Sequence, residues 1–312
     1  MRNLLISDIK YRRQVFTFSD GGEVGLDWAN TENHQSPHQP IVLILPGITG
    51  CSQSEYVKSL VNVSLTEVNA RCVVFNFRGR GGLGLKNPRT YSAANTEDLA
   101  EIVEFLNTNF PEAPVIATGV SLGGIILGNY LAAQGEKARS KLLAAVLISV
   151  CFDTFEGTKS LEKPGLNLLL NRHLANSLVE SIKEVKQHFV SNKTWDLEQV
   201  FTSTTVREFD SRFTAKMFGY KDVVEYYAAA RLYHKVENIK VPSLAINAED
   251  DPFQPGDSLP KEGAARSSDL AIVTTQYGGH VGFVDGFLPT GYFYSDRLFS
   301  QFARAAVSQW TI

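Results

Sequence analysis

Short, almost wholly apolar segments alternate with longer segments of helical periodicity, and this alternation restricts the fold more than any other feature. Continuous apolar strands are expected in a parallel sheet that is covered by helices on both faces. The pattern therefore predicts an α/β fold with a mostly parallel, doubly wound sheet. The apolar segments are Pro40–Leu45, Cys72–Phe77, Val115–Val120, Ala144–Val150 and Val241–Ala248. The helical segments between the first four are Glu55–Asn69, Thr96–Asn109 and Leu122–Gln134.

The two ends of the chain complete this sheet. Near the start, Gln14–Phe18 and Glu23–Asp27 flank Ser19-Asp20-Gly21-Gly22, a turn signal, and so predict an antiparallel hairpin. Near the end, Ala271–Thr275 predicts a last strand and Asp296–Val307 a last helix.

The alternation stops between Phe152 and about Ala230, where the residues are polar and aromatic with helical periodicity. We therefore expect one domain over residues 1–312, with a helical cap inserted at about 152–230. Its apolar residues are expected to line an acyl tunnel, to contact lipid, or only to pack the cap on the sheet. They are Leu166, Leu168, Leu169, Leu170, Phe213 and Phe218.

Charge and composition exclude several classes of protein. The formal net charge is -3, which argues against binding to nucleic acid, because proteins that bind nucleic acid need a basic surface. The 3 cysteines are too few and too scattered for a disulfide framework or a zinc site, so a reduced intracellular setting is expected. Met1–Phe18 has no long apolar run, so we expect no signal peptide or spanning helix there. Any contact with a membrane would be peripheral.

A nucleophile motif follows the third apolar segment. Gly119-Val120-Ser121-Leu122-Gly123 connects the predicted strand directly to the helix beginning at Leu122. In an α/β-hydrolase fold this turn is strained, and the flanking glycines are needed where neighbouring backbone crowds any side chain. The motif predicts that Ser121 is a catalytic nucleophile.

The partners of such a serine follow in the order acid, then histidine. Asp251 comes just after the segment ending at Ala248, and His280 follows the last predicted strand. The histidine would accept the serine proton, and the carboxylate would fix the histidine tautomer. Asp250 is the adjacent alternative. Pro252 biases Asp251 toward an extended conformation, which favours Asp251 as the catalytic acid.

An oxyanion hole requires two backbone donors aimed at the developing negative oxygen. Leu122 N–H is one candidate. The other is expected in Pro46-Gly47-Ile48-Thr49-Gly50, the loop after the first apolar segment. We choose Ile48 because Gly47 allows the backbone to turn, and Thr49 remains an alternative.

Three other patterns are weaker. Gly79–Gly84 matches G-x-G-x-x-G, but Pro88 prevents the helix that a dinucleotide site requires, so a loop is expected. His280 and Asp285 fit the short H-x-x-x-x-D acyltransferase pattern. The charged residues Arg207, Glu208, Asp210 and Arg212 predict a salt-bridged structural corner.

Together these motifs resemble a known family, the eukaryotic α/β-hydrolase domain-containing proteins of the membrane phospholipase and monoacylglycerol-lipase branch (AB hydrolase family 4). The similar segments are Leu45–Gly50, Cys72–Gly79, Pro88–Leu99, Gly119–Gly124, Arg207–Phe213, Met217–Tyr220, Asp250–Phe253 and Tyr277–Phe283. By matching position the resemblance assigns the triad to Ser121, Asp251 and His280, and it implies lipid ester substrates. Family members usually begin with a membrane anchor that is not seen here. We therefore expect either a shortened form or membrane contact through the cap.

The sequence thus predicts a serine hydrolase that cleaves carboxylic esters of lipids through an acyl-serine intermediate, without a metal or organic cofactor. Two alternatives stay open. The acyl group could pass to an alcohol instead of water, or the fold could bind a lipid or hormone without catalysis. The expected location is cytoplasmic or at a membrane surface.

Overall fold

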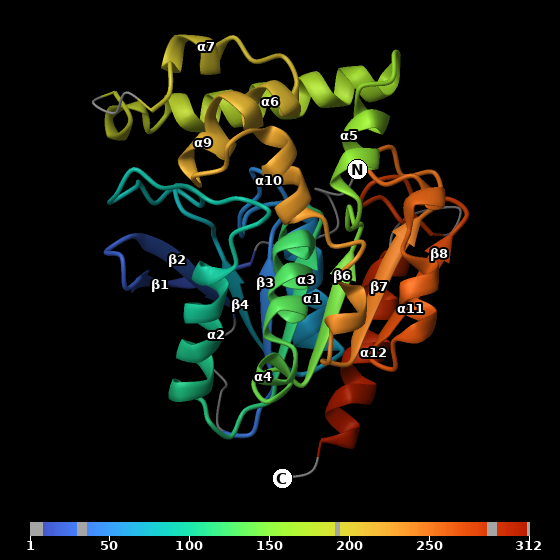
Figure 1. Cartoon of the computed structure of the whole chain (residues 1–312). Helices are drawn as coiled ribbons and strands as arrows, with labels where there is room; N and C mark the ends of the chain where they lie inside the picture. Colours follow the sequence, from blue (N-terminus) through green and yellow to red (C-terminus); the bar gives the residue numbers. More distant parts are fainter. Residues whose placement is uncertain (1–8, 30–35, 191–193, 286–291, 311–312) are drawn as a thin grey trace.

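The structure, a computed structural model, describes residues 9–29, 36–190, 194–285 and 292–310. Its centre is an 8-stranded sheet with the order β1-β2-β4-β3-β5-β6-β7-β8 (Figure 1). β1 and β2 form the predicted antiparallel hairpin, β2 pairs antiparallel with β4, and the remaining pairs are parallel. The strands are β1 (Tyr11–Thr17), β2 (Glu23–Ala29), β3 (Ile41–Leu45), β4 (Arg71–Phe75), β5 (Val115–Val120), β6 (Ala144–Ile148), β7 (Ser243–Ala248) and β8 (Leu270–Thr275).

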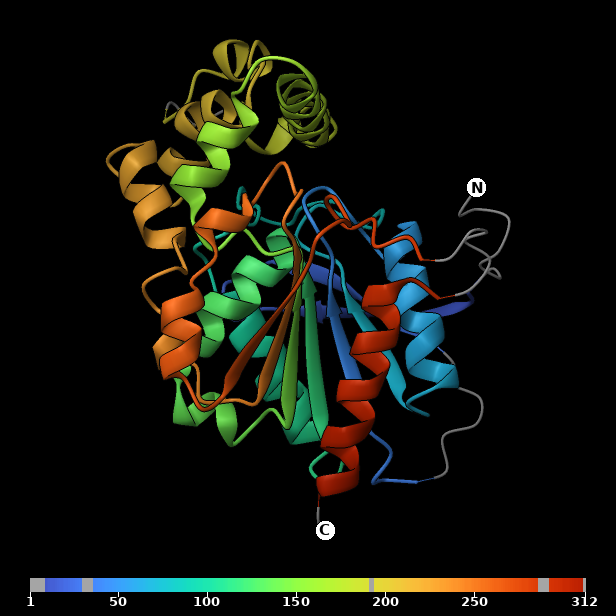
Figure 2. The same ribbon diagram turned by 90° about the vertical axis from the view of Figure 1, so that its right-hand side faces the viewer.

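Helices cover both faces of the sheet, as its apolar strands require. Figure 2 shows α1 and α12 on one face, with α2, α3 and α11 on the other. These helices are α1 (Glu55–Thr66), α2 (Glu97–Asn109), α3 (Leu122–Gln134), α11 (Lys261–Arg266) and α12 (Tyr294–Gln309), and the short α4 (Glu136–Arg139) follows α3. The predicted doubly wound α/β architecture is confirmed.

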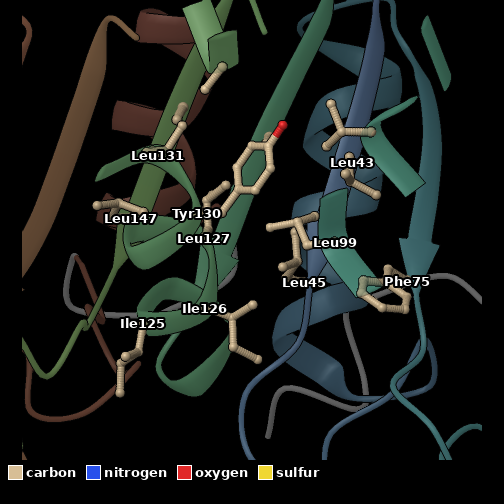
Figure 3. Packing of buried hydrophobic residues seen from close by; sticks show 14 of the residues in the cluster. Leu43, Leu45, Phe75, Leu99, Ile125, Ile126, Leu127, Tyr130, Leu131 and Leu147 are labelled. Atoms are coloured by element: carbon tan, nitrogen blue, oxygen red, sulfur yellow. The ribbon is translucent and has the colours of Figure 1, made fainter. Parts of the chain in front are cut away.

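Helix α3 is the central helix of its layer. Ten of its residues are buried, which explains why its sequence is apolar on nearly every side. Its Ile126, Leu127 and Tyr130 face Leu45 of β3 and Leu99 of α2 in one cluster (Figure 3). This packing fixes the helix that begins directly after Ser121.

The segment between β6 and β7 contains helices and a π-helical turn but no strand among the residues that the structure describes. In Figure 1 these helices lie together at one end of the sheet. They have an apolar cluster of their own, which includes Ile182, Phe189, Trp195 and Phe213. The elements are α5 (Thr154–Leu161), α6 (Leu166–Lys183), α7 (Leu197–Phe201), α8 (Val206–Phe209), the π-helix η3 (Asp210–Thr214), α9 (Ala215–Met217) and α10 (Val223–Ala230).

Some boundaries differ from the sequence prediction. β4 ends at Phe75 rather than at Phe77, and the side chain of the next residue, Asn76, bonds to Asp27 and to Gly25 O. Within the segment expected to be helical, Leu166–Lys183 forms one long helix, α6. Short polar residues inside this amphipathic helix concealed its continuity.

Candidate active site

Ser121 lies in a strained turn between β5 and α3. Its backbone φ of 53° is in the left-handed region, which residues other than glycine rarely adopt. Only glycine fits at the two flanking positions, because a side chain there would collide with neighbouring backbone atoms. A Cβ on Gly119 would lie 2.4 Å from Gly123 O, and one on Gly123 would lie 2.3 Å from Leu45 O. The turn exposes the serine hydroxyl beyond the end of the strand, where a nucleophile is needed.

The three residues predicted as a triad lie within hydrogen-bonding distance of one another. His280 Nε2 is 2.9 Å from Ser121 Oγ, and His280 Nδ1 is 2.9 Å from Asp251 Oδ2. Asp251 is only 2% exposed, and its other oxygen accepts the Phe253 N–H at 2.8 Å. A buried carboxylate in this position can hold one imidazole tautomer, with Nε2 toward the serine.

Asp250 points elsewhere. Its Oδ1 accepts the backbone N–H of Gly279 at 2.7 Å, and the residue is exposed. Adjacent residues at the end of a strand project in opposite directions, so only one of the two aspartates faces the imidazole. The other carboxylate holds the loop that carries His280.

Two further contacts orient the imidazole. The Phe253 ring stacks on it, with ring centroids 4.0 Å apart and an interplanar angle of 25°. Ser149, with a φ of 52°, accepts the Val281 N–H on its Oγ at 3.1 Å. Neither residue was predicted from the sequence. Their positions directly after β6 and the predicted acid were the available signal, because loops at the carboxyl ends of parallel strands converge.

The loop after β3 offers one uncommitted donor. Gly47 N–H donates to Tyr56 Oη at 2.8 Å, Thr49 N–H to Tyr91 Oη at 3.2 Å, and Gly50 N–H to Gly47 O. No described residue accepts from Ile48 N–H. Leu122 is the first residue of α3, so its N–H has no acceptor within the helix. Ile48 and Leu122 both line the cavity with Ser121.

This cavity extends from Ser121 and His280 into the segment between β6 and β7. One wall is aliphatic and consists of Leu161, Leu174, Leu178, Ile182 and Val185. The leucines 166, 168, 169 and 170 and the phenylalanines 213 and 218 are absent from the lining, so the predicted tunnel has other walls. Leu166 and Leu169 are instead 68% and 63% exposed.

The prediction that Asp210 takes part in a salt-bridged corner is wrong. Arg207 pairs with Glu162 at 2.9 Å, and Arg212 approaches Glu208 at 3.8 Å. Asp210 is turned away from these ions and lines the cavity. Sequence spacing failed here because a π-helical turn at Asp210–Thr214 changes the direction of the side chains.

The other two weak patterns carry no chemistry at this site. Gly79–Gly84 is a loop without a helix, as predicted, with Gly79, Gly81 and Gly82 at positive φ. Asp285 forms an ion pair with Arg297 rather than contacting Ser121. Among the described residues no group of three or more side chains is suited to a metal ion.

Comparison with known proteins decides the family. The sequence model of the alpha/beta hydrolase fold matches residues 40–287. The chain belongs to the α/β-hydrolase family. It is 41% identical over 303 residues to mouse Phospholipase ABHD3, covering 96% of this chain and 72% of that protein. This match confirms the predicted resemblance to eukaryotic α/β-hydrolase domain-containing proteins.

Two other matches widen the comparison for this α/β-hydrolase. The monoacylglycerol lipase of Saccharomyces cerevisiae is 32% identical over 254 residues, which cover 78% of this chain and 55% of that protein. The structure of the Pyrococcus furiosus esterase Pf2001 superposes with a TM-score of 0.60 at 15% identity, covering 97% of this chain and 92% of that one. The structural likeness shows the fold. No helix in the described parts of the chain is long and apolar enough to cross a bilayer.

Proposed function

We propose that this α/β-hydrolase is a serine esterase that hydrolyses carboxylic esters of lipids, such as phospholipids or monoacylglycerols. The observation that carries this proposal is the continuous chain Ser121–His280–Asp251 at one end of a cavity with an aliphatic wall. The similar proteins from mouse and yeast are named a phospholipase and a monoacylglycerol lipase, which supports a lipid ester as substrate.

In the proposed reaction, Ser121 Oγ attacks the ester carbonyl while His280 Nε2 accepts the serine proton. Ile48 and Leu122 N–H groups stabilise the negative oxygen of the tetrahedral intermediate. The intermediate collapses, the ester C–O bond breaks, and the alcohol leaves with the proton from His280. Water then attacks the acyl-serine, giving its proton to His280, and the carboxylic acid is released as the proton returns to Ser121.

We further propose that residues 152–230 act as a cap within a single domain. The aliphatic residues of α5 and α6 in the cavity wall would take the acyl chain, because apolar surface buried on binding is stabilising. The exposed Leu166 and Leu169 at the start of α6, with basic Lys163 and Arg172 beside them, would contact the lipid surface.

The proposal is tested with a fluorophosphonate probe and a p-nitrophenyl ester. We expect Ser121→Ala to fold normally and to lose labelling and nearly all turnover. Cys151 is the matched control, because its thiol also lines the cavity. Burial and the nearby Asp251 and Asp153 raise the pKa of the Cys151 thiol far above its usual range, so it is a poor nucleophile. Cys151→Ser should therefore keep the label, and labelling that survives in Ser121→Ala would refute the proposal.

A further inference from the structure

Asp210 is a buried carboxyl group in the candidate active-site cavity that the proposed ester hydrolysis does not use. It is 8% exposed and lies at the start of η3, the π-helical turn between α8 and α9. Tyr227 Oη donates to its Oδ2 at 3.1 Å, and the Thr214 hydroxyl also bonds to it. A π-turn inside a helix is uncommon and is frequent at functional sites.

The Asp210 carboxyl has no cationic partner among the described residues. Both arginines that line the cavity are engaged elsewhere. Arg78 makes two bonds to Asp98, at 2.6 and 2.8 Å, and pairs with Asp20, while Arg80 donates to Thr49 O at 2.5 Å. Burial of a carboxylate without a compensating charge is unfavourable. Accordingly, burial raises the pKa of Asp210 to about 7, although the Thr214 and Tyr227 hydroxyls oppose the shift.

Three aromatic residues line the same cavity as this carboxyl. They are Tyr91, Tyr226 and Tyr227, and Tyr227 bonds directly to Asp210. Their hydroxyl oxygens already form hydrogen bonds within the protein. Tyr91 Oη accepts the Thr49 N–H, Tyr226 Oη accepts the Ala93 N–H, and Tyr227 Oη donates to Asp210. The rings are therefore what these residues can offer to a ligand.

We propose that Asp210 and the rings of Tyr91, Tyr226 and Tyr227 form a binding site for the ammonium group of a lipid ester. The ammonium group supplies the cation that the Asp210 carboxylate lacks, and tyrosine faces attract a cation, most strongly where water is excluded. A metal ion is disfavoured as the ligand, because the described residues include no group of three or more His, Cys, Asp or Glu side chains suited to hold one. This inference rests on the proposed ester hydrolysis, and it selects ammonium-bearing phospholipids over neutral monoacylglycerols.

The site can be tested without turnover in the full-length Ser121→Ala protein. Choline and its neutral isostere 3,3-dimethylbutan-1-ol have the same shape and differ in charge. At pH 8 we expect calorimetry to show that choline binds at least tenfold more tightly than 3,3-dimethylbutan-1-ol. Adding Asp210→Asn should abolish this preference, whereas adding Glu208→Gln, the matched carboxylate-to-amide change outside the cavity, should retain it. Equal affinity for the two probes, or binding of neither, would overturn the site.

Turnover by the protein with Ser121 intact gives a second measurement. The two substrates are a lysophosphatidylcholine and a monoacylglycerol with the same acyl chain, and the quantity compared is the ratio of their kcat/KM values. We expect Asp210→Asn to lower this ratio, the preference for the lysophosphatidylcholine, by at least tenfold. An unchanged ratio contradicts the inference even if both esters are cleaved through Ser121. Loss of all Ser121-dependent cleavage in the unaltered protein would refute the ester-hydrolase function instead, and the choline measurement would still stand on its own.

Discussion

The two carboxylates after β7 differ in partner although they are adjacent in sequence. Asp251 is buried against His280 Nδ1, while Asp250 is exposed and holds Gly279 N–H. The imidazolium that forms when His280 accepts the serine proton is stabilised by the first carboxylate alone. The direction in which each side chain projects from the end of β7 therefore determines which aspartate contacts His280.

We expect Asp251→Asn to lose on the order of 10⁴ in kcat, because an amide at this position favours the wrong imidazole tautomer. Asp250→Asn should stay within roughly tenfold of the parent, about 1.4 kcal/mol in activation free energy, since it weakens only a loop contact. Ester turnover by both variants, with circular dichroism to confirm folding, decides the matter. If Asp250→Asn proves to be the inactive variant, Asp250 is the orienting acid.

How much of the site can be read from sequence differs from residue to residue. Ser121, Asp251 and His280 could be proposed because their order and their positions after strands follow from the motif and the topology. Phe253 and Ser149 were not proposed, since a ring stack and a loop contact have no motif and only their positions after the acid and after β6 pointed to them. Asp210 was assigned to the wrong environment because its charged neighbours suggested ion pairs that its π-turn does not allow.

At the scale of elements, the junction of β5 and α3 depends on close contact between backbones. A Cβ on Gly123 would lie 2.3 Å from Leu45 O and 2.4 Å from Pro46 O, and neither atom can move without shifting β3 or the loop carrying Ile48. We expect Gly123→Ala to lower Tm by several degrees and kcat by at least tenfold. Gly84→Ala is the control, because a Cβ there meets nothing within 4 Å. Unchanged Tm and kcat in Gly123→Ala would show that this contact is unimportant.

The start of α6 is the second element that can be tested. We expect Leu166→Ser with Leu169→Ser to reduce co-flotation with phospholipid vesicles, because two exposed apolar side chains are removed from the proposed contact. Cleavage of a short soluble ester should change little, since neither leucine lines the cavity. Val15→Ser on β1 removes an exposed apolar residue elsewhere and serves as control. An equal loss of vesicle co-flotation and of short-ester cleavage, with a lower Tm, would indicate that the two leucines only pack the helix.

The elements themselves were predictable to different degrees. β5 and α3 have the predicted bounds, Val115–Val120 and Leu122–Gln134, because a strand buried on both faces and a nearly fully buried helix give unmistakable apolar runs. The segment from α5 to α10 was predicted as helical, and α10 has the expected bounds, Val223–Ala230, but the other helix boundaries in the segment were not predicted. Apart from α6, its helices are short, and the segment packs through aromatic contacts such as Phe189–Phe213, which leave little periodicity in the sequence.

Across the whole molecule, buried carboxyl groups respond to pH in opposite ways. Burial opposes ionisation of Asp27, but hydrogen bonds from Arg13, Ser52 and Asn76 lower its pKa. Asp27 therefore stabilises the folded state above the unfolded pKa of about 3.8, and this stability is lost as pH falls through the lower folded value. Asp210 has the opposite sign, since its pKa is raised.

Because burial raises the pKa of Asp210, this residue makes the stability of the folded protein depend on pH. The unfolded chain releases the Asp210 proton near pH 3.8, whereas burial raises the pKa in the folded protein, which keeps the proton until about pH 7. Between these values the folded state binds more protons, so the Asp210 contribution to stability is fully present below about pH 4 and is lost as pH rises through 7. Asp210→Asn resembles the protonated acid at every pH. We therefore expect Tm of the parent relative to the variant to be lower at pH 8 than at pH 5. Saturating choline should restore part of the difference at pH 8, because it supplies the missing cation to the folded state. Parallel Tm curves for parent and variant would mean that Asp210 is not titrating in the cavity, and the ammonium site would lose its electrostatic basis.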